Sequence, residues 1–167
     1  HGDRFMRKAC IEPITFREDG TIVEAEMTSQ GASSPLDAYS RTDAFRACLL
    51  HGNTRIRLAE EGGCHEILSG LHNGDWAAFK YLDFGEKSPS SVTIRIRPQK
   101  GGRLGIATDQ VYQGDFVSVD IPGGDGSKWI ELSARIEDDI TGKRALFLHF
   151  YGDDGDLFDI DWIRFDK

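Results

Sequence analysis

The chain has 167 residues, of which 39% are hydrophobic, so it is long and apolar enough to fold around a core of its own. Its 28 acidic residues outnumber its 20 basic ones, and the formal net charge of -8 argues against a nucleic-acid partner, which binds through clustered Lys and Arg. The sequence holds no apolar run of about 20 residues, the length of a membrane span, so we expect no membrane partner.

The first elements in chain order form a predicted β-hairpin. Two strands, 9–16 and 21–27, flank a turn in which Gly20 supplies the positive φ of a tight connection. Residues 28–35 have the composition of a linker. The chain also begins with His1 rather than Met, and we expect it to be a piece of a longer protein. The predicted segments are a preceding domain over 1–31, a linker over 32–36 and the main domain over 37–167.

The main domain is predicted to consist mostly of short strands. Residues 36–50 are the stretch that could form a helix, although their apolar positions keep no clean helical period. Beyond them, apolar and polar residues alternate in segments separated by Gly-rich turns, which is typical of an all-β sandwich or barrel. The predicted strands cover 92–97, 116–121, 129–136, 145–151 and 157–165.

Acidic residues gather near the C-terminus. Such a cluster could bind Ca²⁺, which takes about six to eight oxygen ligands, although the spacing does not match a helix–loop–helix calcium site. The alternative is a set of solubilising turn residues. Glycoside hydrolysis would need a carboxyl group with a raised pKa in an apolar cleft, and these residues lie mostly on turns, so we expect no catalysis. The cluster consists of Asp153, Asp154, Asp156, Asp159 and Asp161.

Tryptophans are the more informative residues for binding. Sugar rings present apolar C–H faces that stack on flat aromatic rings, while nearby polar side chains take the hydroxyls. Trp129 follows a Gly-rich loop, an unusual place for a core tryptophan. Trp162 lies within an apolar strand, so the core is expected. Trp76 begins a strand, and both roles remain open for it.

A series of short motifs runs from about Leu68 to Phe165, namely His72–Trp76, Asp83–Gly85, Ser91–Arg97, Gly126–Trp129, Leu146–Phe150 and Leu157–Phe165. In their order and spacing, these motifs resemble family 6 carbohydrate-binding modules.

Three further segments lie in the first thirty or so residues, namely Gly2–Phe5, Arg7–Pro13 and Asp19–Ile22. They resemble the last propeller strands of family 43 glycoside hydrolases.

The two resemblances together imply an all-β fold, a jelly-roll β-sandwich with an N-terminal β-hairpin appendage. They imply a non-catalytic module that targets a plant cell-wall polysaccharide, of the xylan, arabinan or β-glucan type, for a covalently attached hydrolase. That hydrolase would be of the arabinofuranosidase or xylosidase type, and an extracellular or secreted protein is expected. The alternative is a structural accessory domain that has lost sugar binding.

The resemblance also implies where a sugar would bind. At the loop end of the sandwich, Trp129 matches one of two rings that enclose a sugar, and the family's hydrogen-bonding Asn falls on Asp156. The position of the second ring falls on Gly70, and Tyr39 or His72 would have to replace it. A second site in the family lies on the concave sheet face, with Trp76 as its platform.

A structural calcium ion is the one cofactor that the resemblance implies. In the family it often lies between an early strand and an Asp of the last strand. Asp43 and Asp161 match these positions, whereas Phe45 replaces a carboxylate. A calcium ion held by Asp43 and Asp161 is therefore an expectation from the resemblance.

Overall fold

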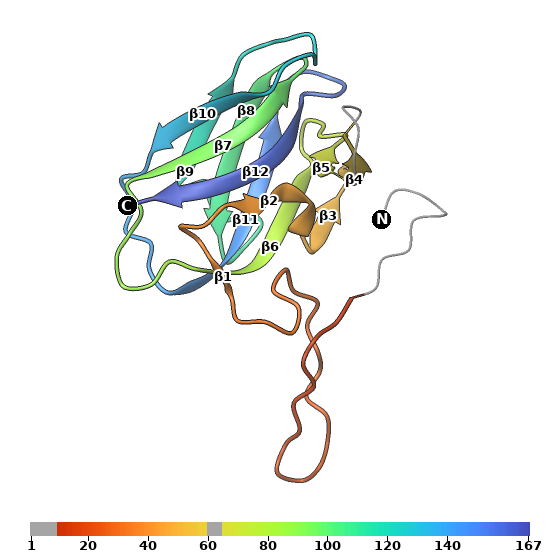
Figure 1. Ribbon diagram of the computed structural model, residues 1–167, viewed down its shortest axis with the longest axis vertical. Coiled ribbons are helices and arrows are strands. Elements are labelled where there is room, and N and C mark those ends of the chain that lie inside the picture. The colour runs from red at the N-terminus through yellow and green to blue at the C-terminus, as the bar shows by residue number, and fades with distance from the viewer. Residues whose placement is uncertain (1–9, 60–64) are drawn as a thin grey trace.

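The computed structural model describes residues 10–59 and 65–167. Two six-stranded sheets face each other as a sandwich (Figure 1), so the all-β prediction is confirmed. In the first sheet the order is β1-β6-β11-β8-β9, and β3 also pairs with β6. Its strands are β1 (Leu36–Asp37), β3 (Leu49–His51), β6 (Trp76–Asp83), β8 (Gly102–Thr108), β9 (Val117–Ile121) and β11 (Lys143–Tyr151).

In the second sheet the order is β10-β7-β12-β5-β4, and β2 also pairs with β12. Its strands are β2 (Thr42–Asp43), β4 (Arg55–Leu58), β5 (Glu66–Ser69), β7 (Ser91–Pro98), β10 (Ile130–Arg135) and β12 (Phe158–Asp166). In the described residues, the structure has no helix long and apolar enough to cross a membrane.

The core lies between the two sheets. Because successive side chains of a strand point to opposite faces, every second residue of β7 is buried, with Val92, Ile94 and Ile96 inside. On the facing sheet, Leu146 and Leu148 of β11 belong to the same buried cluster. The alternate residues of each strand point to the outer face of its sheet, and on β11 these are Phe147, His149 and Tyr151.

The longer predicted strands are confirmed by β7, β9, β10, β11 and β12. The stretch 36–50 is not an α-helix. It contains the short strands β1, β2 and β3 and one 3-10 turn, Ala44–Arg46. Its irregular apolar spacing gives no continuous helical face, and its two- and three-residue strands instead complete the edges of both sheets.

The predicted N-terminal hairpin is a turn with a single bridge between Phe16 and Ile22. Backbone hydrogen bonds from Arg17 N–H to Thr21 O and from Val23 N–H to Thr15 O close it. The predicted strand 21–27, and the described part of the predicted strand 9–16, do not extend as strands beyond this bridge. A two-stranded hairpin with no third strand is marginal by itself, which accounts for the difference.

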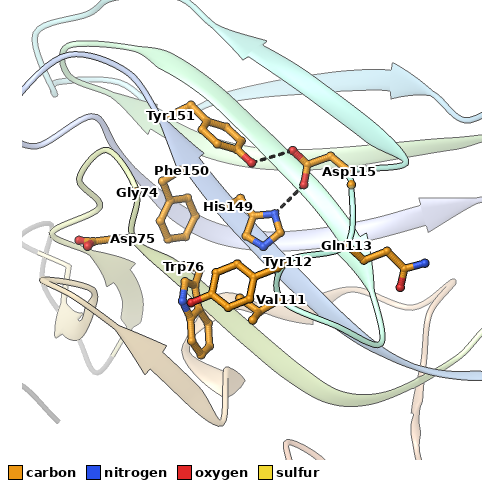
Figure 2. Close-up of a pocket in the computed structure, with 11 residues that line it drawn as sticks. Gly74, Asp75, Trp76, Val111, Tyr112, Gln113, Asp115, His149, Phe150 and Tyr151 are labelled. Atoms are coloured by element: carbon orange, nitrogen blue, oxygen red, sulfur yellow. Dashed lines mark hydrogen bonds and ion pairs between the residues drawn. The ribbon is translucent and has the colours of Figure 1, made fainter.

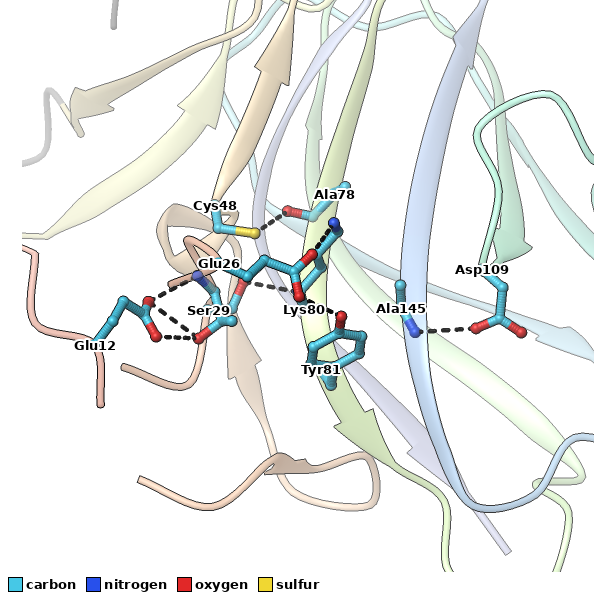
Figure 3. A network of polar contacts seen from close by, with 10 residues as sticks. Glu12, Glu26, Ser29, Cys48, Ala78, Lys80, Tyr81, Asp109 and Ala145 are labelled. Atoms are coloured by element: carbon cyan, nitrogen blue, oxygen red, sulfur yellow. Dashed lines mark hydrogen bonds and ion pairs between the residues drawn. The ribbon is translucent and has the colours of Figure 1, made fainter. Parts of the chain in front are cut away.

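Ser29 joins the N-terminal segment to the first sheet. Along one edge of β6, β3 pairs with Trp76 to Ala78 and β1 pairs with Leu82 and Asp83, which leaves Lys80 between them. The Ser29 N–H donates to Lys80 O at 2.5 Å, and the Lys80 N–H donates to Ser29 Oγ at 3.2 Å (Figure 3). Ser29 is buried and supplies one hydrogen-bond donor and one acceptor to the edge of β6 in this gap.

Candidate functional site

A hollow lined largely by aromatic side chains lies on the outer face of the first sheet. It has a volume of about 320 Å³ and is lined by residues 74–76 at the start of β6, 111–115 of the β8–β9 loop and 149–151 at the end of β11 (Figure 2). We call it the sheet groove. Trp76 and His149 are direct partners in the pairing of β6 with β11, so their side chains stand next to each other on this face.

Strand register also explains how a loop residue reaches the groove. His149 pairs on its other side with Gly105 of β8. A Cβ atom at Gly105 would overlap with the Asp115 carboxylate, so only glycine leaves space for Asp115 beside His149. The loop thereby delivers a carboxylate onto the surface of the sheet.

Asp115 holds two aromatic side chains of the groove by hydrogen bonds. His149 Nδ1 lies 2.5 Å from Asp115 Oδ1, and the Tyr151 hydroxyl donates to Asp115 Oδ2 at 3.0 Å (Figure 2). Burial and this hydrogen bond raise the pKa of Tyr151. Two nitrogen atoms in the groove are buried without a hydrogen-bond partner, His149 Nε2 and Trp76 Nε1.

Trp76 is half-buried and clamped on one side. The His51 ring stacks parallel to its indole, with centroids 5.2 Å apart and planes 4° apart, and Phe147 packs against it edge-on. Trp76 lines the groove, whereas His51 does not. An aromatic ring fixed in this way is a suitable platform for the apolar face of a sugar.

The loop end of the sandwich has two further hollows, which share Asp156. One, of about 250 Å³, includes Arg57, Ser69 and Arg97 in its lining, and the other, of about 470 Å³, includes Lys100 and Asp125. Asp156 Oδ1 lies 2.9 Å from His72 Nε2, so its carboxylate already has a partner. Their linings are mainly polar side chains, with no aromatic ring among them.

Trp129 lies on the outer face of the second sheet and lines neither hollow. Two guanidinium groups pack over its ring, those of Arg95 at 5.6 Å and Arg97 at 5.1 Å from the ring centroid. These are cation–π contacts, and they hold the indole against β7.

Gly70 follows β5 and cannot hold the missing second ring. Its φ of +66° lies in the left-handed region, and a Cβ atom there would be 2.8 Å from Asn53 O. Tyr39 does not replace the ring, because its hydroxyl donates to Lys87 O, and neither loop-end hollow includes it. His72 does lie at the loop end, paired with Asp156.

Asp43 and Asp161 are neighbours across β2 and β12, but their surroundings do not fit calcium. Asp161 is 1% exposed, and both of its oxygens are occupied: Oδ1 lies 2.8 Å from His65 Nε2 and Oδ2 lies 2.9 Å from Arg95 Nη1. Arg41 lies between the two carboxylates and contacts both. A guanidinium therefore stands where a cation would have to be, and the described residues contain no group of three possible metal ligands.

The structure therefore separates the residues predicted for binding. Asp156 is at the loop end near Gly70, Trp129 is on the second sheet, and Trp76 is in the sheet groove on the other sheet. Sequence reasoning missed the residues around Trp76, namely Tyr112, Asp115, His149 and Tyr151. The alternation in β11 was the available signal for two of them, because His149 and Tyr151 have the opposite phase to the core residue Leu148.

A two-sheet sandwich with an aromatic-lined groove on a sheet face is compatible with saccharide binding. The profile of the family described as "Carbohydrate binding module (family 6)" matches residues 50–167. The chain belongs to this family, whose members are binding modules rather than catalytic domains.

Two relatives by sequence are longer enzymes. An arabinoxylan arabinofuranohydrolase of Paenibacillus polymyxa is 27% identical over 165 residues, which is 95% of this chain and 26% of that protein. A xylosidase/arabinosidase of Thermoclostridium stercorarium is 29% identical over 172 residues, covering 91% of this chain and 35% of that protein. The chain thus spans about a quarter to a third of these relatives.

Solved structures agree with the fold. A family 6 module from Clostridium cellulolyticum in complex with xylose has a TM-score of 0.71 and 26% identity, and the match covers 78% of this chain and 99% of that one. A family 43 arabinoxylan arabinofuranohydrolase from Bacillus subtilis has a TM-score of 0.74 and 24% identity, over 93% of this chain and 33% of that one.

Proposed function

We propose that this module binds a neutral saccharide of a plant cell-wall polysaccharide in the sheet groove and thereby keeps an attached hydrolase near its substrate. The observation that carries this proposal is Trp76, which lines the groove and whose indole is held in place by the stacked His51 ring. The loop end supports sugar binding less well, because Gly70 offers no ring and Trp129 packs on Arg95 and Arg97.

The type of polysaccharide is inferred from the relatives, which are named for arabinoxylan, xylosides and arabinosides. Xylan, arabinan and β-glucan chains are uncharged, which suits a module with a net charge of -8 and a groove floored by aromatic rings. Weak affinity is sufficient for this role, since attachment to the enzyme raises the effective concentration at the substrate.

Calorimetric titration of the 167-residue chain with xylotetraose, arabinotetraose and cellotetraose tests the proposal. We expect at least one of these to bind, and Trp76→Ala to abolish measurable binding. The matched variant Trp129→Ala removes a tryptophan outside the groove and is expected to leave the affinity within about twofold. If none of the oligosaccharides binds the unaltered chain, sugar binding is not its main role.

The hydrolase is proposed to precede this module in the same chain. Of the seven large hydrophobic residues exposed in the described parts of the chain, five lie between residues 11 and 27. Apolar side chains gathered on one segment in this way indicate a partner surface. The relatives extend far beyond this chain, and we infer that the covering surface is a catalytic domain of the arabinofuranosidase or xylosidase type. The five residues are Ile11, Ile14, Phe16, Ile22 and Met27.

A structural accessory role is the second candidate, favoured by the hydrogen bonds of Ser29 in the edge of β6. A module tied in this way to its preceding segment could brace the hydrolase without binding sugar. Deleting residues 37–167 from the full-length protein separates the two roles. A large drop in the melting temperature of the hydrolase supports bracing, whereas an unchanged melting temperature with reduced activity on insoluble polysaccharide supports targeting.

A further inference from the structure

We propose that Tyr112 and His149 complete the sheet groove: the Tyr112 ring closes over a sugar residue resting on Trp76, and His149 Nε2 accepts a hydrogen bond from one of its hydroxyls. This inference rests on the proposed function and specifies its recognition chemistry. The groove would then offer a sugar two aromatic rings, those of Trp76 and Tyr112, whereas the lining of the loop-end hollows contains none.

Tyr112 is an unusually exposed aromatic residue. Its side chain lies on the rim of the groove, near Trp76 and His149 (Figure 2), and 92% of its surface is open to solvent. Such a ring contributes little to the packing of the chain that carries it. An amphipathic ring at the edge of a groove can bury its apolar face against a ligand while its hydroxyl stays in water.

The loop that carries Tyr112 is anchored at both ends. Asp109 accepts hydrogen bonds from Arg144 Nη1 at 3.0 Å and from the Ala145 N–H at 3.3 Å, and Asp115 is held by His149 and Tyr151. Between these anchors, the backbone hydrogen bonds are those of tight turns within the loop. The Tyr112 ring can therefore move over the groove without disturbing either anchor.

His149 presents a hydrogen-bond acceptor toward the groove. Its Nδ1 faces the Asp115 carboxylate, which can only accept, so in the neutral ring Nδ1 carries the proton and Nε2 carries the lone pair. Nε2 points away from Asp115, toward Trp76 and Tyr112 (Figure 2). The side chain is only 8% exposed and Nε2 has no partner, which is a costly arrangement unless a ligand or water satisfies it.

The two unpartnered nitrogens have opposite roles. Trp76 Nε1 carries a hydrogen and donates, whereas His149 Nε2 accepts. A hydroxyl group does both, so a sugar can supply partners to the pair, while an anion would lie beside the Asp115 carboxylate. Both nitrogen atoms are buried, and Val111 packs beside Trp76 against the apolar cluster that includes Phe147. A neighbouring side chain has to shift for a hydroxyl to reach these nitrogen atoms.

The experiment compares groove variants of the 167-residue chain in titrations with the same three oligosaccharides. Tyr112→Ala is expected to weaken binding by about tenfold, from the loss of one stacking face. His149→Phe keeps a flat ring without nitrogen atoms and is expected to weaken it by about three- to tenfold. The melting temperature of Tyr112→Ala should equal that of the unaltered chain, because the side chain is exposed, so a loss of affinity in it is not a folding defect.

His72→Phe is the matched control, because it removes a His–Asp pair outside the groove, at the loop end. It should leave the affinity unchanged. If Trp76→Ala abolishes binding while Tyr112→Ala and His149→Phe bind as well as the unaltered chain, the inference is wrong and the proposed function stands. If the groove variants keep binding and His72→Phe removes it, sugar binds at the loop end; if Trp129→Ala removes it instead, sugar binds at Trp129 on the second sheet. Either result overturns the groove inference. Failure of the unaltered chain to bind overturns both.

Discussion

Asp161 is a buried carboxylate with three partners, two arginines and a histidine. Arg41, Arg95 and His65 approach its two oxygens at 2.8 to 3.3 Å. The carboxylate is buried, while the side chains of Arg41 and Arg95 remain 48% and 37% exposed, so the arginines keep much of their solvation. The position at which the family resemblance implies calcium is thus stabilised by charges that the chain itself provides.

Asp161→Asn is therefore expected to destabilise the module, and removal of calcium is not. Loss of the charge-assisted hydrogen bonds should lower the free energy of unfolding by about 1–3 kcal/mol, measured in urea. Asp153→Asn alters an exposed acidic residue of the same cluster and should change it by less than about 0.5 kcal/mol. A melting temperature that falls on addition of EDTA would contradict this account.

Gly70 shows why sequence alignment alone misjudges the loop end. Alignment with the family suggests that an aromatic residue at this position would restore sugar binding. However, the backbone of Gly70 is in the left-handed region, and Asn53 O lies 2.8 Å from the Cβ position. Gly70→Tyr should thus lower the free energy of unfolding by about 1–3 kcal/mol and should not improve sugar affinity. Urea unfolding combined with oligosaccharide titration measures both, and a stable variant that binds more tightly would refute the prediction.

At the scale of elements, the N-terminal segment is fastened to β6 by side chains as well as by Ser29. Glu26 contacts Lys80 Nζ and accepts a hydrogen bond from the Tyr81 hydroxyl at 2.5 Å (Figure 3). Lys80 and Tyr81 lower the pKa of Glu26, and the hydrogen bond to Glu26 together with burial raises the pKa of Tyr81 to about 12. Within the segment, Glu12 accepts hydrogen bonds from the N–H and hydroxyl groups of Thr28.

These contacts predict a loosening of the segment in acid. The pKa of Glu26 in the folded chain lies below its ordinary value of 4.5, so its ionised form stabilises the fold above that pH. The stabilisation is lost as the pH falls through the lowered pKa. The Tyr81 ring resonances should report this as a titration with a midpoint below 4.5. The titration should disappear in Glu26→Gln and persist in Glu24→Gln, which alters an exposed neighbour; a midpoint at or above 4.5 would contradict it.

The long strands could be predicted because their own residues alternate, as in β7, where Val92, Ile94 and Ile96 face the core. The short strands β1 to β3 could not, since they form by pairing with residues far along the chain. For the same reason, the site could be predicted only in part from the sequence. Trp76 is identifiable from its motif, but its neighbourhood depends on the register of β6 with β11 and on a loop carboxylate over Gly105.

At the scale of the whole molecule, the groove and the N-terminal segment share one strand. Trp76 and Lys80 are four residues apart on β6, which corresponds to about 13 Å along a strand. The proposed hydrolase thus joins the module close to the sugar site, through hydrogen bonds rather than a free tether. This geometry limits the orientations that the groove can take relative to the preceding domain.

Loosening this connection should reduce targeting. In the full-length protein, a flexible Gly-Ser insertion of about ten residues after Gly31 is expected to lower activity on insoluble arabinoxylan severalfold, since a flexible spacer lowers the effective concentration. Activity on a soluble aryl glycoside should stay the same, because it needs no targeting. The same insertion after Gly142, in a turn of the sandwich, controls for the added length. Equal activity of the first variant and the unaltered protein on both substrates would refute this.

The Ser29 pairing also has a mechanical consequence. A polysaccharide held at Trp76 and drawn along the strand pulls on β6, and the load passes to the Ser29 hydrogen bonds and to the flanking ladders with β3 and β1. These bonds lie across the strand, so they are loaded together in shear rather than opened one after another. With a sugar bound as proposed, force on the polysaccharide would therefore be transmitted to the proposed preceding domain through several hydrogen bonds at once rather than through a flexible tether.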